Sequence, residues 1–486
     1  MQVAFVSSEI APFAKVGGLA DVSAALPQAL AQRGHDVRVF APLYRRARAG
    51  DYTFEKVEGL ESLEASFGPH RVPYSIKTSV LPGTDLKIYF VDCPPLYDRE
   101  GIYTNDPDEH LRYVTLCYAA MNVCQHMGFS PDIVHANDWQ TGLLPLILNV
   151  RMAWDRQRFA KTKTVFTIHN LAHQGAFGAN TLADTGLEDA ANLFHQDQLN
   201  AGVINYMLTG ILYASAVTTV SPTYAKEIQR DETGGSLAGF LRARSESVVG
   251  ILNGIDANEW NPDDDAHVDH PYSADSLDGK EKNKRQLLEE LGLTYDPKIP
   301  VAGIVTRLTW QKGIELVLEA LPPLLAEGRI RFVALGSGAS NYEYQLTALQ
   351  KRFPQHVCFY RGFSNRLAHR IEAGADMFLM PSRFEPCGLN QMYSLRYGTV
   401  PVVRNTGGLA DTVQTFSPTT RQGTGFVFEH ATGGSLLRAL QAALSVWPHR
   451  ELWRQLQLNG MRQDFTWNQQ VARYESLYRQ LLSDQT

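Results

Sequence analysis

The residue types best suited to chemistry cluster after a short apolar run in the last third of the chain. Met377–Met380 has the composition of a buried parallel strand, and Arg383 and Glu385 follow it in the next loop. Open α/β sheets place ligand chemistry at the carboxyl ends of their strands. The turn 387–390 then opens a helix, and a helix N-terminus favours an anion such as a phosphate. These residues predict a site for an anionic ligand; a capping or solvated carboxylate is the simpler alternative for Glu385 alone.

Two other loops combine cations with glycines after predicted strands. Lys15 precedes Gly17 and Gly18, which lack a Cβ and let backbone amides approach a phosphate closely. An ordinary tight turn is the alternative, and the absence of GxGxxG argues against a dinucleotide fingerprint. Arg307 and Lys312 lie five positions apart in a loop that enters a helix. Two cations there suit a pyrophosphate, with a solvated charge pair as the alternative.

Polar residues also follow two strands in the first half. Asn137 and Asp138 precede Trp139; carboxylates bind hydroxyl pairs and aromatic faces stack on sugars, so this group favours a sugar site. A core tryptophan with a capping aspartate is an equally good interpretation. His169 and Asn170 follow the next strand. A lone histidine is more often structural than catalytic, and no i, i+4 histidine pair is present to predict a metal.

The elements that position these residues occur in two consecutive series of apolar strands and amphipathic helices. The first series begins at Gln2–Val6 and the second at Val301–Val305. Between them, the polar, acidic, proline-bearing segment 258–276 predicts a surface loop close to the domain boundary. Such alternation predicts an α/β fold with two Rossmann-like, doubly wound domains. We place them at residues 1–250 and 251–465.

The composition and net charge of the chain limit the kinds of molecule that it is expected to bind. The chain has 486 residues, 44% hydrophobic and 20% charged, which is ordinary for a globular enzyme. A net charge of −6 makes nucleic acid and anionic membranes unlikely partners by charge. Five scattered cysteines without CxxC spacing favour reduced thiols. No signal peptide or membrane span is evident, so we expect a cytoplasmic protein.

Several of these motifs resemble one family. SRFEPCGL at 382–389, GTVPVVRNTGGLADTV at 398–413 and KVGGLADV at 15–22 are similar to segments of the bacterial glycogen synthases and plant starch synthases. These are glycosyltransferase-B enzymes that make α-1,4-glucan. The resemblance implies two domains facing a deep inter-domain cleft, with a C-terminal helix, 466–486, that returns to the first domain.

The resemblance also implies roles for individual residues. Lys15, Gly17 and Gly18 contact the distal phosphate and sugar of a nucleotide-glucose, with Asp21 nearby. The catalytic residues that we predict are Glu385, His169, Arg307 and Lys312. The substrate-binding residues that we predict are Lys15, Gly17, Gly18, Asp21, Asp138, Asn170, Phe363, Cys387, Gly388, Leu389 and Asn390.

Three positions depart from the pattern of the wider family. Phe363 stands where a tyrosine is common, which keeps the stacking face and loses a hydroxyl. Asn390 replaces the threonine of some members. Tyr393 occupies the position of a second glutamate found in the wider glycosyltransferase-B class, as expected for the glucan synthases.

The predicted activity is retaining transfer of α-glucose from ADP-glucose to the non-reducing end of an α-1,4-glucan, with no cofactor and no metal. An aromatic such as Phe363 stacks on adenine and uracil alike, so UDP-glucose remains an alternative donor. The same fold supports epimerases and sucrose- or trehalose-type transferases, against which the quoted motifs argue. A non-catalytic glucan-binding protein, an NAD-dependent dehydrogenase and a phosphorylase are three rival functions. The residues present give little support to any of them.

Overall fold

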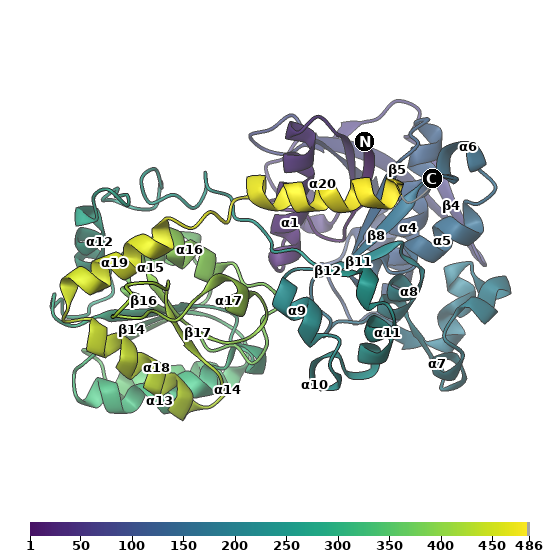
Figure 1. Ribbon diagram of the computed structural model, residues 1–486. Helices are drawn as coiled ribbons and strands as arrows, with labels where there is room; N and C mark the ends of the chain where they lie inside the picture. The colour runs from purple at the N-terminus through teal and green to yellow at the C-terminus, as the bar shows by residue number, and fades with distance from the viewer. Residues whose placement is uncertain (484–486) are drawn as a thin grey trace. The chain divides into compact units, whose positions relative to one another are not determined.

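The chain folds into two compact units. The computed structural model describes residues 1–483, and the last three residues of the predicted C-terminal segment, 484–486, lie outside them. Unit 1 comprises Met1–Gly254 and the segment that begins at Trp467, and unit 2 comprises Ile255–Thr466. Each unit is coloured as a continuous range in Figure 1 except for the yellow C-terminal helix, which belongs with the purple and blue elements of unit 1.

Unit 1 is built on one large, mainly parallel sheet. Its strand order is β12-β11-β8-β7-β1-β2-β6-β5-β3, and β4 pairs with β5. The order reverses between β1 and β7, which run parallel to each other. The strands are β1 (Gln2–Val6), β2 (Asp36–Pro42), β3 (Glu55–Lys56), β4 (Leu63–Phe67), β5 (His70–Val80), β6 (Lys87–Asp92), β7 (Ile133–Asn137), β8 (Lys163–Ile168), β11 (Ala216–Thr219) and β12 (Val248–Gly250).

Helices cover this sheet because its strands are apolar on both faces. Val3 and Phe5 of β1 join a core that includes α1 and the C-terminal helix α20, while Ala4 and Val6 point to the other face and are equally buried. A small pair of strands, β9 (Ala176–Gly178) and β10 (Val203–Asn205), lies outside the sheet. The longer helices are α1 (Gly18–Gln32), α4 (Glu109–His126), α5 (Leu144–Arg151), α7 (Gln196–Asn200), α8 (Tyr206–Tyr213), α9 (Pro222–Glu227), α11 (Ala238–Ala243) and α20 (Trp467–Ser483).

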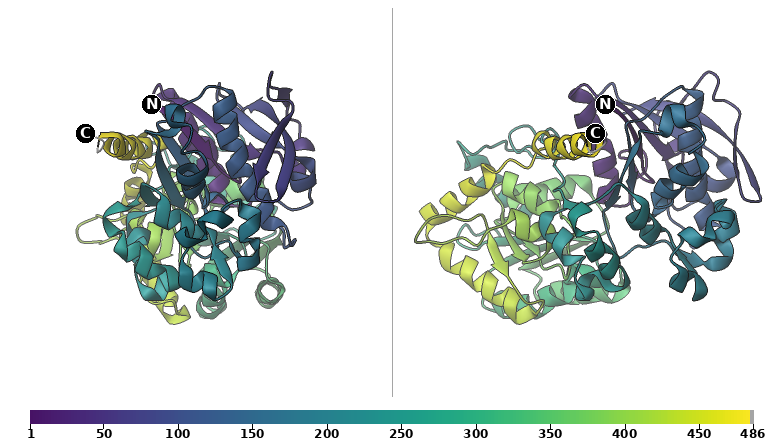
Figure 2. Two further views of the ribbon diagram at one scale, coloured as in Figure 1. Left: turned by 90° about the vertical axis from the view of Figure 1, so that its right-hand side faces the viewer. Right: turned by 45° about the vertical axis from the view of Figure 1, so that its right-hand side comes forward.

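The C-terminal helix α20 completes the core of unit 1. Its apolar stripe packs with α1, and the Tyr478 hydroxyl shares a 2.6 Å hydrogen bond with Nδ1 of the buried His135 in β7. All views place the yellow α20 beside the purple N-terminal elements, with the two ends of the chain in the same unit (Figure 2). The predicted return of this helix to the first half of the chain is therefore confirmed.

Unit 2 contains a six-stranded, entirely parallel sheet. Its order is β15-β14-β13-β16-β17-β18, the doubly wound arrangement, which reverses between β13 and β16. The strands are β13 (Val301–Val305), β14 (Arg331–Gly336), β15 (Val357–Arg361), β16 (Met377–Met380), β17 (Val400–Arg404) and β18 (Phe426–Phe428). The helices are α12 (Asp278–Glu290), α13 (Ile314–Ala326), α14 (Ser340–Arg352), α15 (Asn365–Gly374), α16 (Asn390–Arg396), α17 (Gly407–Thr412), α18 (Gly433–Val446) and α19 (Arg450–Met461).

Alternate residues of each strand in unit 2 enter different cores. Met377 and Leu379 of β16 face the core that contains α13, α14 and α18, whereas Phe378 and Met380 face the core that contains α12 and α15. These helices lie on opposite sides of the sheet in Figure 1. A strand with apolar residues on both faces has to be covered on both, so the continuous apolar runs predict this layering. The predicted α/β class is confirmed.

Two features differ from the sequence-based expectations. The antiparallel hairpin of β4 and β5 was not predicted, because its strands alternate buried residues with exposed or partly exposed polar ones. The segment 258–276, expected as a surface loop, buries Trp260 and Tyr272 in the core of unit 2. Trp260 stacks between His369 and Tyr393, with ring centroids 3.8 and 3.9 Å away. None of the helices in residues 1–483 combines the length and hydropathy needed to cross a bilayer.

Candidate functional site

Except for Phe363, which follows the edge strand β15, the predicted site residues lie at or next to the point where a sheet reverses its strand order. In unit 1 they follow β1, β7 and β8, and in unit 2 they follow β13 and β16. Two crossover connections leave in opposite directions at such a point, so the strand ends there are not covered by a helix. Each unit therefore presents its polar loops where α/β sheets bind ligands.

The glycine loop of unit 1 is held by a buried carboxylate that follows β1. Glu9 is 4% exposed, and its Oε2 accepts hydrogen bonds from the amides of Val16 at 2.6 Å and Gly17 at 3.1 Å. Its Oε1 accepts one from the Tyr103 hydroxyl at 2.5 Å. Burial raises the pKa of Glu9, against the opposing effect of these hydrogen bonds. Glu9 thus fixes the backbone just before α1.

Neither the backbone conformation nor the packing of unit 1 requires a glycine at position 17. Its φ of −150° is ordinary extended backbone, and a Cβ added there would meet nothing within 4 Å. Beside it, Lys15 Nζ lies 2.6 Å from Asp21 Oδ1, and burial raises the pKa of Asp21 despite this ion pair. The lysine side chain is half exposed. The loop therefore offers a cation and an open strip of backbone to solvent.

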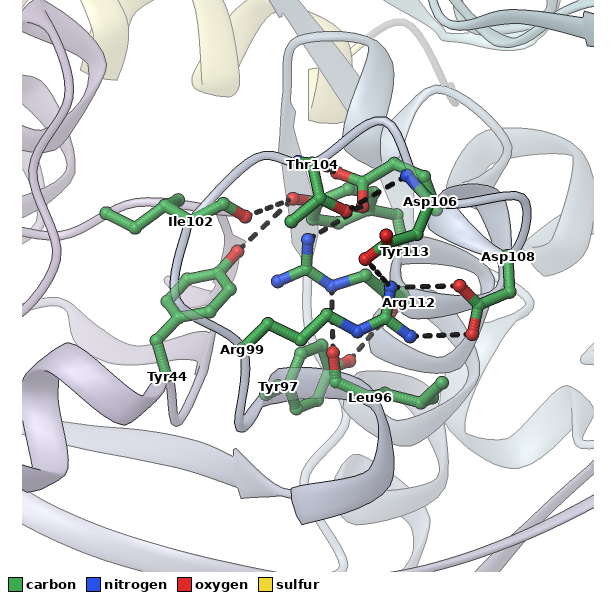
Figure 3. Close-up of polar contacts among 11 residues, drawn as sticks. Tyr44, Leu96, Tyr97, Arg99, Ile102, Thr104, Asp106, Asp108, Arg112 and Tyr113 are labelled. Atoms are coloured by element: carbon green, nitrogen blue, oxygen red, sulfur yellow. Dashed lines mark hydrogen bonds and ion pairs between the residues drawn. The ribbon is translucent and has the colours of Figure 1, made fainter.

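A buried arginine network holds the loop that carries Tyr103 (Figure 3). Arg112 of α4 is fully buried and pairs with Glu109 at 2.8 Å, while its Nε donates to the carbonyl of Leu96. Glu109 in turn accepts the hydroxyl of Thr104 at 2.6 Å. Helix α4 therefore fixes the chain next to Tyr103, and through Tyr103 it fixes Glu9.

Asp138, after β7, has an unusual backbone and a perturbed carboxyl. Its φ of +55° with ψ of −178° lies in a region that only glycine adopts freely, a strain of about 1–3 kcal/mol. Its Oδ1 accepts hydrogen bonds from the amides of His169 at 2.7 Å and Asn170 at 3.4 Å. Burial raises the pKa of Asp138 to about 7, against those two bonds. The carboxylate therefore ties the ends of β7 and β8 together.

The hydrogen bonds around His169 determine its tautomer. Asn137 Nδ2 donates to the carbonyl of Val6 at 3.0 Å, so its Oδ1 is the atom that faces His169 Nε2, also at 3.0 Å. His169 Nε2 must then carry the proton. Burial lowers the pKa of His169 to about 3, so the ring is neutral at physiological pH. Its Nδ1 remains a hydrogen-bond acceptor.

The side chains of Trp139 and Asn170 are engaged mainly in packing and in a local turn. Trp139 packs edge-on against Tyr113, with ring centroids 5.1 Å apart, and tightly over Gly175, so most of its indole serves the packing of unit 1. The side chain of Asn170 caps its own turn by accepting the amide of Ala172 at 3.1 Å. Its backbone, through Asp138, is the part that belongs to the strand-end group.

In unit 2, Lys312 and Glu385 form a direct ion pair. Lys312 Nζ lies 2.5 Å from Glu385 Oε2, and the same oxygen accepts the hydroxyl of Ser382 at 2.9 Å. Glu385 is 5% exposed. These residues come from the loops after β13 and β16, the two strands that flank the reversal of order. The sequence separates them by 73 positions, and the fold brings them together.

Glycines make room for the loop that carries Glu385. A Cβ on Gly407 would lie 1.9 Å from the carbonyl oxygen of Glu385, and one on Gly408 would lie 2.1 Å from that of Cys387. Gly388 has φ of +72° and lies against the Glu385 side chain. The GG pair at the start of α17 is therefore required by packing, and helix α16 begins only at Asn390, after a turn rather than at Cys387.

Arg307 is the exposed cation of this group. Its guanidinium makes no hydrogen bond or ion pair to any described residue, while the following residue, Leu308, is fixed by backbone hydrogen bonds to Ser337 and Ala339. Gly338 packs so closely on Leu308 that a Cβ would lie 2.4 Å from its carbonyl oxygen. The LGSG turn after β14 therefore braces the loop that presents Arg307.

Of the remaining predicted residues, one is exposed and three belong to the turn and the first residue of α16. Phe363 is 78% exposed after β15, at the edge strand of the sheet, and its ring is free for stacking. Asn390 instead donates to the carbonyl of Val305 at 2.8 Å, which joins α16 to the end of β13. Cys387 is buried and Leu389 is half-buried, both in the turn before α16.

Sequence reasoning missed Glu9 and Tyr103. Glu9 follows an apolar strand directly, so the rule that places chemistry at strand ends was sufficient to find it. Tyr103 lies in a loop far from any motif, and nothing in its sequence surroundings pointed to Glu9. Within residues 1–483, no group of three or more histidine, cysteine, aspartate or glutamate side chains is arranged to hold a metal ion.

Comparisons with known proteins identify the family to which the chain belongs. Residues 2–243 match the family described as starch synthase catalytic domain, and residues 293–457 match glycosyl transferases group 1. Glycogen synthase 2 of Geobacter sulfurreducens is 44% identical over 99% of this chain and 98% of its own length. Glycogen synthase of Anaeromyxobacter dehalogenans is 46% identical over 99% of both chains.

A solved structure shares the architecture. The catalytic domain of starch synthase IV from Arabidopsis thaliana, bound to ADP and acarbose, superimposes with a TM-score of 0.91 at 33% identity, over 99% of each chain. Sucrose-phosphate synthase from Thermosynechococcus elongatus, at 17% identity and a TM-score of 0.60, shares the fold alone. With relatives of this identity along its full length, the chain belongs to the glycogen synthase and starch synthase family of glycosyltransferases.

Proposed function

We propose that the protein is a retaining glucosyltransferase that transfers α-glucose from ADP-glucose to the non-reducing end of an α-1,4-glucan and releases ADP. The observation that carries the proposal is the Lys312–Glu385 pair with the exposed Arg307 beside it in sequence, at the strand reversal of unit 2. A polar group of this kind suits a ligand that carries both hydroxyls and a diphosphate. The bound ADP in the starch synthase IV structure supports the choice of donor.

The leaving group needs positive charge as its bond to glucose breaks. Arg307 and Lys312 supply two cations, and Lys15 supplies a third from unit 1. Preorganised donors of this type contribute about 3–4 kcal/mol each to the transition state in well-studied enzymes. The backbone amides of the turn 387–390 add further donors. Phe363 offers a flat, exposed face for the base.

The glucose is held rather than attacked by the protein. Glu385 is engaged by an ammonium and a hydroxyl, and a carboxylate so neutralised is a poor nucleophile. It positions glucose hydroxyls, and His169 Nδ1 accepts another. Asp138 and Asn170 fix the strand ends beside His169. Retention then follows from same-face attack by the acceptor hydroxyl, assisted by the departing phosphate; trapping a glucosyl adduct on a protein side chain would contradict it.

The first test is nucleotide release from ADP-glucose and, separately, UDP-glucose, each with and without glycogen. We expect glycogen-dependent release of ADP, abolished in Glu385→Ala and in Lys15→Ala. Release from UDP-glucose alone would keep the mechanism and change the donor. Absence of release from both donors, with glycogen still bound, would leave a glucan-binding protein and refute the proposal.

A glycine substitution tests the contact with the donor phosphate. Gly17→Ala introduces a methyl group into open space, so we expect an unchanged Tm. If amides of this loop touch the phosphate, the same methyl group keeps the donor away and raises its KM about tenfold or more. Gly239→Ala, which also meets nothing within 4 Å, is the matched control: it leaves the KM unchanged, and because Gly239 lies in helix α11 the Tm stays the same or rises slightly.

A further inference from the structure

An exposed tryptophan lies in the loop of unit 2 that carries Arg307 and Lys312. Trp310 begins a single 3₁₀ turn after β13, Trp310–Lys312, and is 59% exposed. The function proposed above gives the two cations of this loop a role and leaves the tryptophan without one. Single exposed apolar residues are common, so exposure alone assigns Trp310 no role. Its contacts and its position carry the inference.

The indole ring of Trp310 is held in a fixed orientation by a cation. The guanidinium of Arg383 lies over the ring, 4.8 Å from the centroid. Arg383 is itself fixed, because its Nε and Nη2 contact Oε1 of Glu315 at 2.7 and 2.6 Å. Helix α13 carries Glu315, whose other oxygen accepts the hydroxyl of Tyr342 at 3.3 Å. One face of the indole is therefore covered, and the other is presented to solvent.

The loops after β13 and β16 run together and place this indole next to the ion pair of the site. The amide of Arg383 donates to the carbonyl of Gln311 at 2.7 Å. On one side of this bond lies the contact of Trp310 with Arg383, and on the other lies the pair of Lys312 and Glu385. A 3₁₀ turn rises about 2 Å per residue, so the backbones of Trp310 and Lys312 are about 4 Å apart along it.

The chemistry around the indole suits an uncharged sugar ring. Glu315 neutralises Arg383, so the indole is not accompanied by a free charge that would select an anion. Among residues 1–483, the indole Nε1 has no hydrogen-bond partner and can donate to a hydroxyl. A flat apolar face with a free donor at its edge matches the apolar face and the hydroxyls of a glucose unit.

The position of Trp310 distinguishes the acceptor from the donor. Phe363, which we assign to the base, follows β15, two strands from β13 in the sheet. Two strand spacings are about 10 Å, so Trp310 lies at the sugar end of a bound nucleotide-sugar and away from its base. The donor glucose is assigned to Glu385. The next ring that an aromatic beside Glu385 can meet belongs to the acceptor.

We propose that Trp310 is an acceptor-binding residue, whose open face stacks on a glucose ring close to the non-reducing end of the glucan. The identity of the sugar rests on the proposed function. Because the contact is made beside the reacting end, it acts on short and long acceptors alike. Trp310 therefore lowers the KM for the acceptor and does not change the KM for ADP-glucose.

The first test is the initial rate of ADP release by the full-length protein. We expect Trp310→Ala to raise the KM for maltotriose and for glycogen about tenfold, with kcat and the KM for ADP-glucose unchanged. Trp310→Phe keeps a stacking face over Arg383 and should stay within about threefold of the wild type. Tyr344→Ala, which removes a 75% exposed aromatic from α14, is the matched control and keeps every constant.

Two kinetic results would overturn the proposal. The first is a wild-type KM for both acceptors in Trp310→Ala. The second is a fall in kcat together with a rise in the KM for ADP-glucose and no change in the KM for the acceptor. That pattern would mean that the indole only supports the neighbouring pair of Lys312 and Glu385.

Binding measurements separate this proposal from the proposed reaction. Calorimetric titration of the full-length protein with maltoheptaose, with ADP present, requires no transfer of glucose. Affinity that falls about tenfold in Trp310→Ala and returns in Trp310→Phe supports the acceptor contact even if the wild type proves inactive. Equal affinity in the wild type and Trp310→Ala would refute it. Loss of ADP binding in Trp310→Ala, with maltoheptaose binding kept, would assign the indole to the nucleotide and refute it as well.

Discussion

At the scale of single residues, the ion pair of Lys312 and Glu385 stabilises the structure in addition to the chemical role that we propose for it. Glu385 is almost fully buried, and Lys312 and Ser382 both donate to its Oε2. Removal of one partner of a buried pair leaves the other charge without compensation. Loss of activity in a variant of either residue therefore has to be separated from loss of stability.

We predict that Lys312→Met lowers the stability of unit 2 by about 1–3 kcal/mol, less than for a fully buried pair because Lys312 is partly exposed. The double variant Lys312→Met with Glu385→Gln should recover much of that loss and none of the transferase activity. Urea unfolding and ADP release measure the two effects. Equal stability of the single and double variants would show that the pair contributes little to the fold.

Asp138 gives a prediction of pH dependence. Its pKa in the folded protein is about 7, against an ordinary value of 3.8, so the folded state binds more protons between those values. The contribution of Asp138 to stability therefore falls as pH rises through this window, by up to about 1.4 kcal/mol per pH unit. Asp138→Asn keeps an oxygen acceptor for the amide of His169 and has no such titration.

The Tm of both proteins between pH 4.5 and 7.5 tests this. The difference between Asp138→Asn and the wild type should grow in favour of the variant as pH rises. Buried carboxyls that do not interact with Asp138, such as Glu372 of unit 2, titrate equally in both proteins and cancel in the difference. A pH-independent difference would contradict the raised pKa.

At the scale of elements, the start of α17 determines where the Glu385 loop lies. Gly407 has φ of +44° and leaves no space for a Cβ beside the Glu385 carbonyl. We predict that Gly407→Ala destabilises unit 2 by about 2 kcal/mol or more and lowers kcat, because the loop has to move. Gly434→Ala, where the nearest atom is a flexible arginine tip 3.8 Å away, is the control within helix α18.

Thermal unfolding and initial rates compare the two variants. Gly434→Ala should be neutral or slightly stabilising, since alanine is favoured over glycine in a helix by about 0.5–1 kcal/mol. Retention of wild-type kcat by Gly407→Ala would mean that the loop accommodates the methyl group without displacing Glu385.

The strands of the two sheets were the most predictable elements. Apolar runs such as Gln2–Val6 and Met377–Met380 coincide with β1 and β16, because a parallel strand covered on both faces has no polar side. The hairpin β4–β5 escaped prediction because its solvent-facing residues hide it in a polar stretch. The segment 258–276 escaped because its polar majority conceals the few aromatic residues that anchor it.

The site was predictable as separate loops and much less as a set of contacts. The strand-end rule selected His169 and Glu385 as candidates, and the family motifs selected the other candidates. The partners were not visible in sequence: Glu9 holds Gly17, and Asn137 sets the tautomer of His169. Such pairs join strands that are adjacent in space and distant along the chain, so only the fold reveals them.

At the scale of the whole molecule, unit 1 is assembled from both ends of the chain. Helix α20 packs on α1, and Trp467, Val471 and Tyr474 belong to the same core as the strands β1 and β2. Without α20, this core would expose a large apolar face to water. Unit 2, Ile255–Thr466, is continuous in sequence and has two cores of its own.

We therefore predict that residues 255–466 expressed alone fold cooperatively, whereas residues 1–254 alone aggregate or bind a hydrophobic dye. A circular permutant that joins the C-terminal helix directly to Met1 should restore folding of the first unit. Circular dichroism and hydrogen exchange measure both outcomes. A stable, monomeric 1–254 fragment would show that α20 is dispensable.

The return of α20 to unit 1 also determines when unit 1 can complete its core during synthesis in the cell. The first unit leaves the ribosome early, yet its core stays open until the final helix has been synthesised after all of unit 2. At about 5–20 residues per second, that interval is on the order of ten to forty seconds. During this time the half-made unit exposes apolar surface, the property that makes incomplete chains prone to aggregation. A message truncated anywhere before its last codons would then yield a chain that is degraded rather than a partly active enzyme.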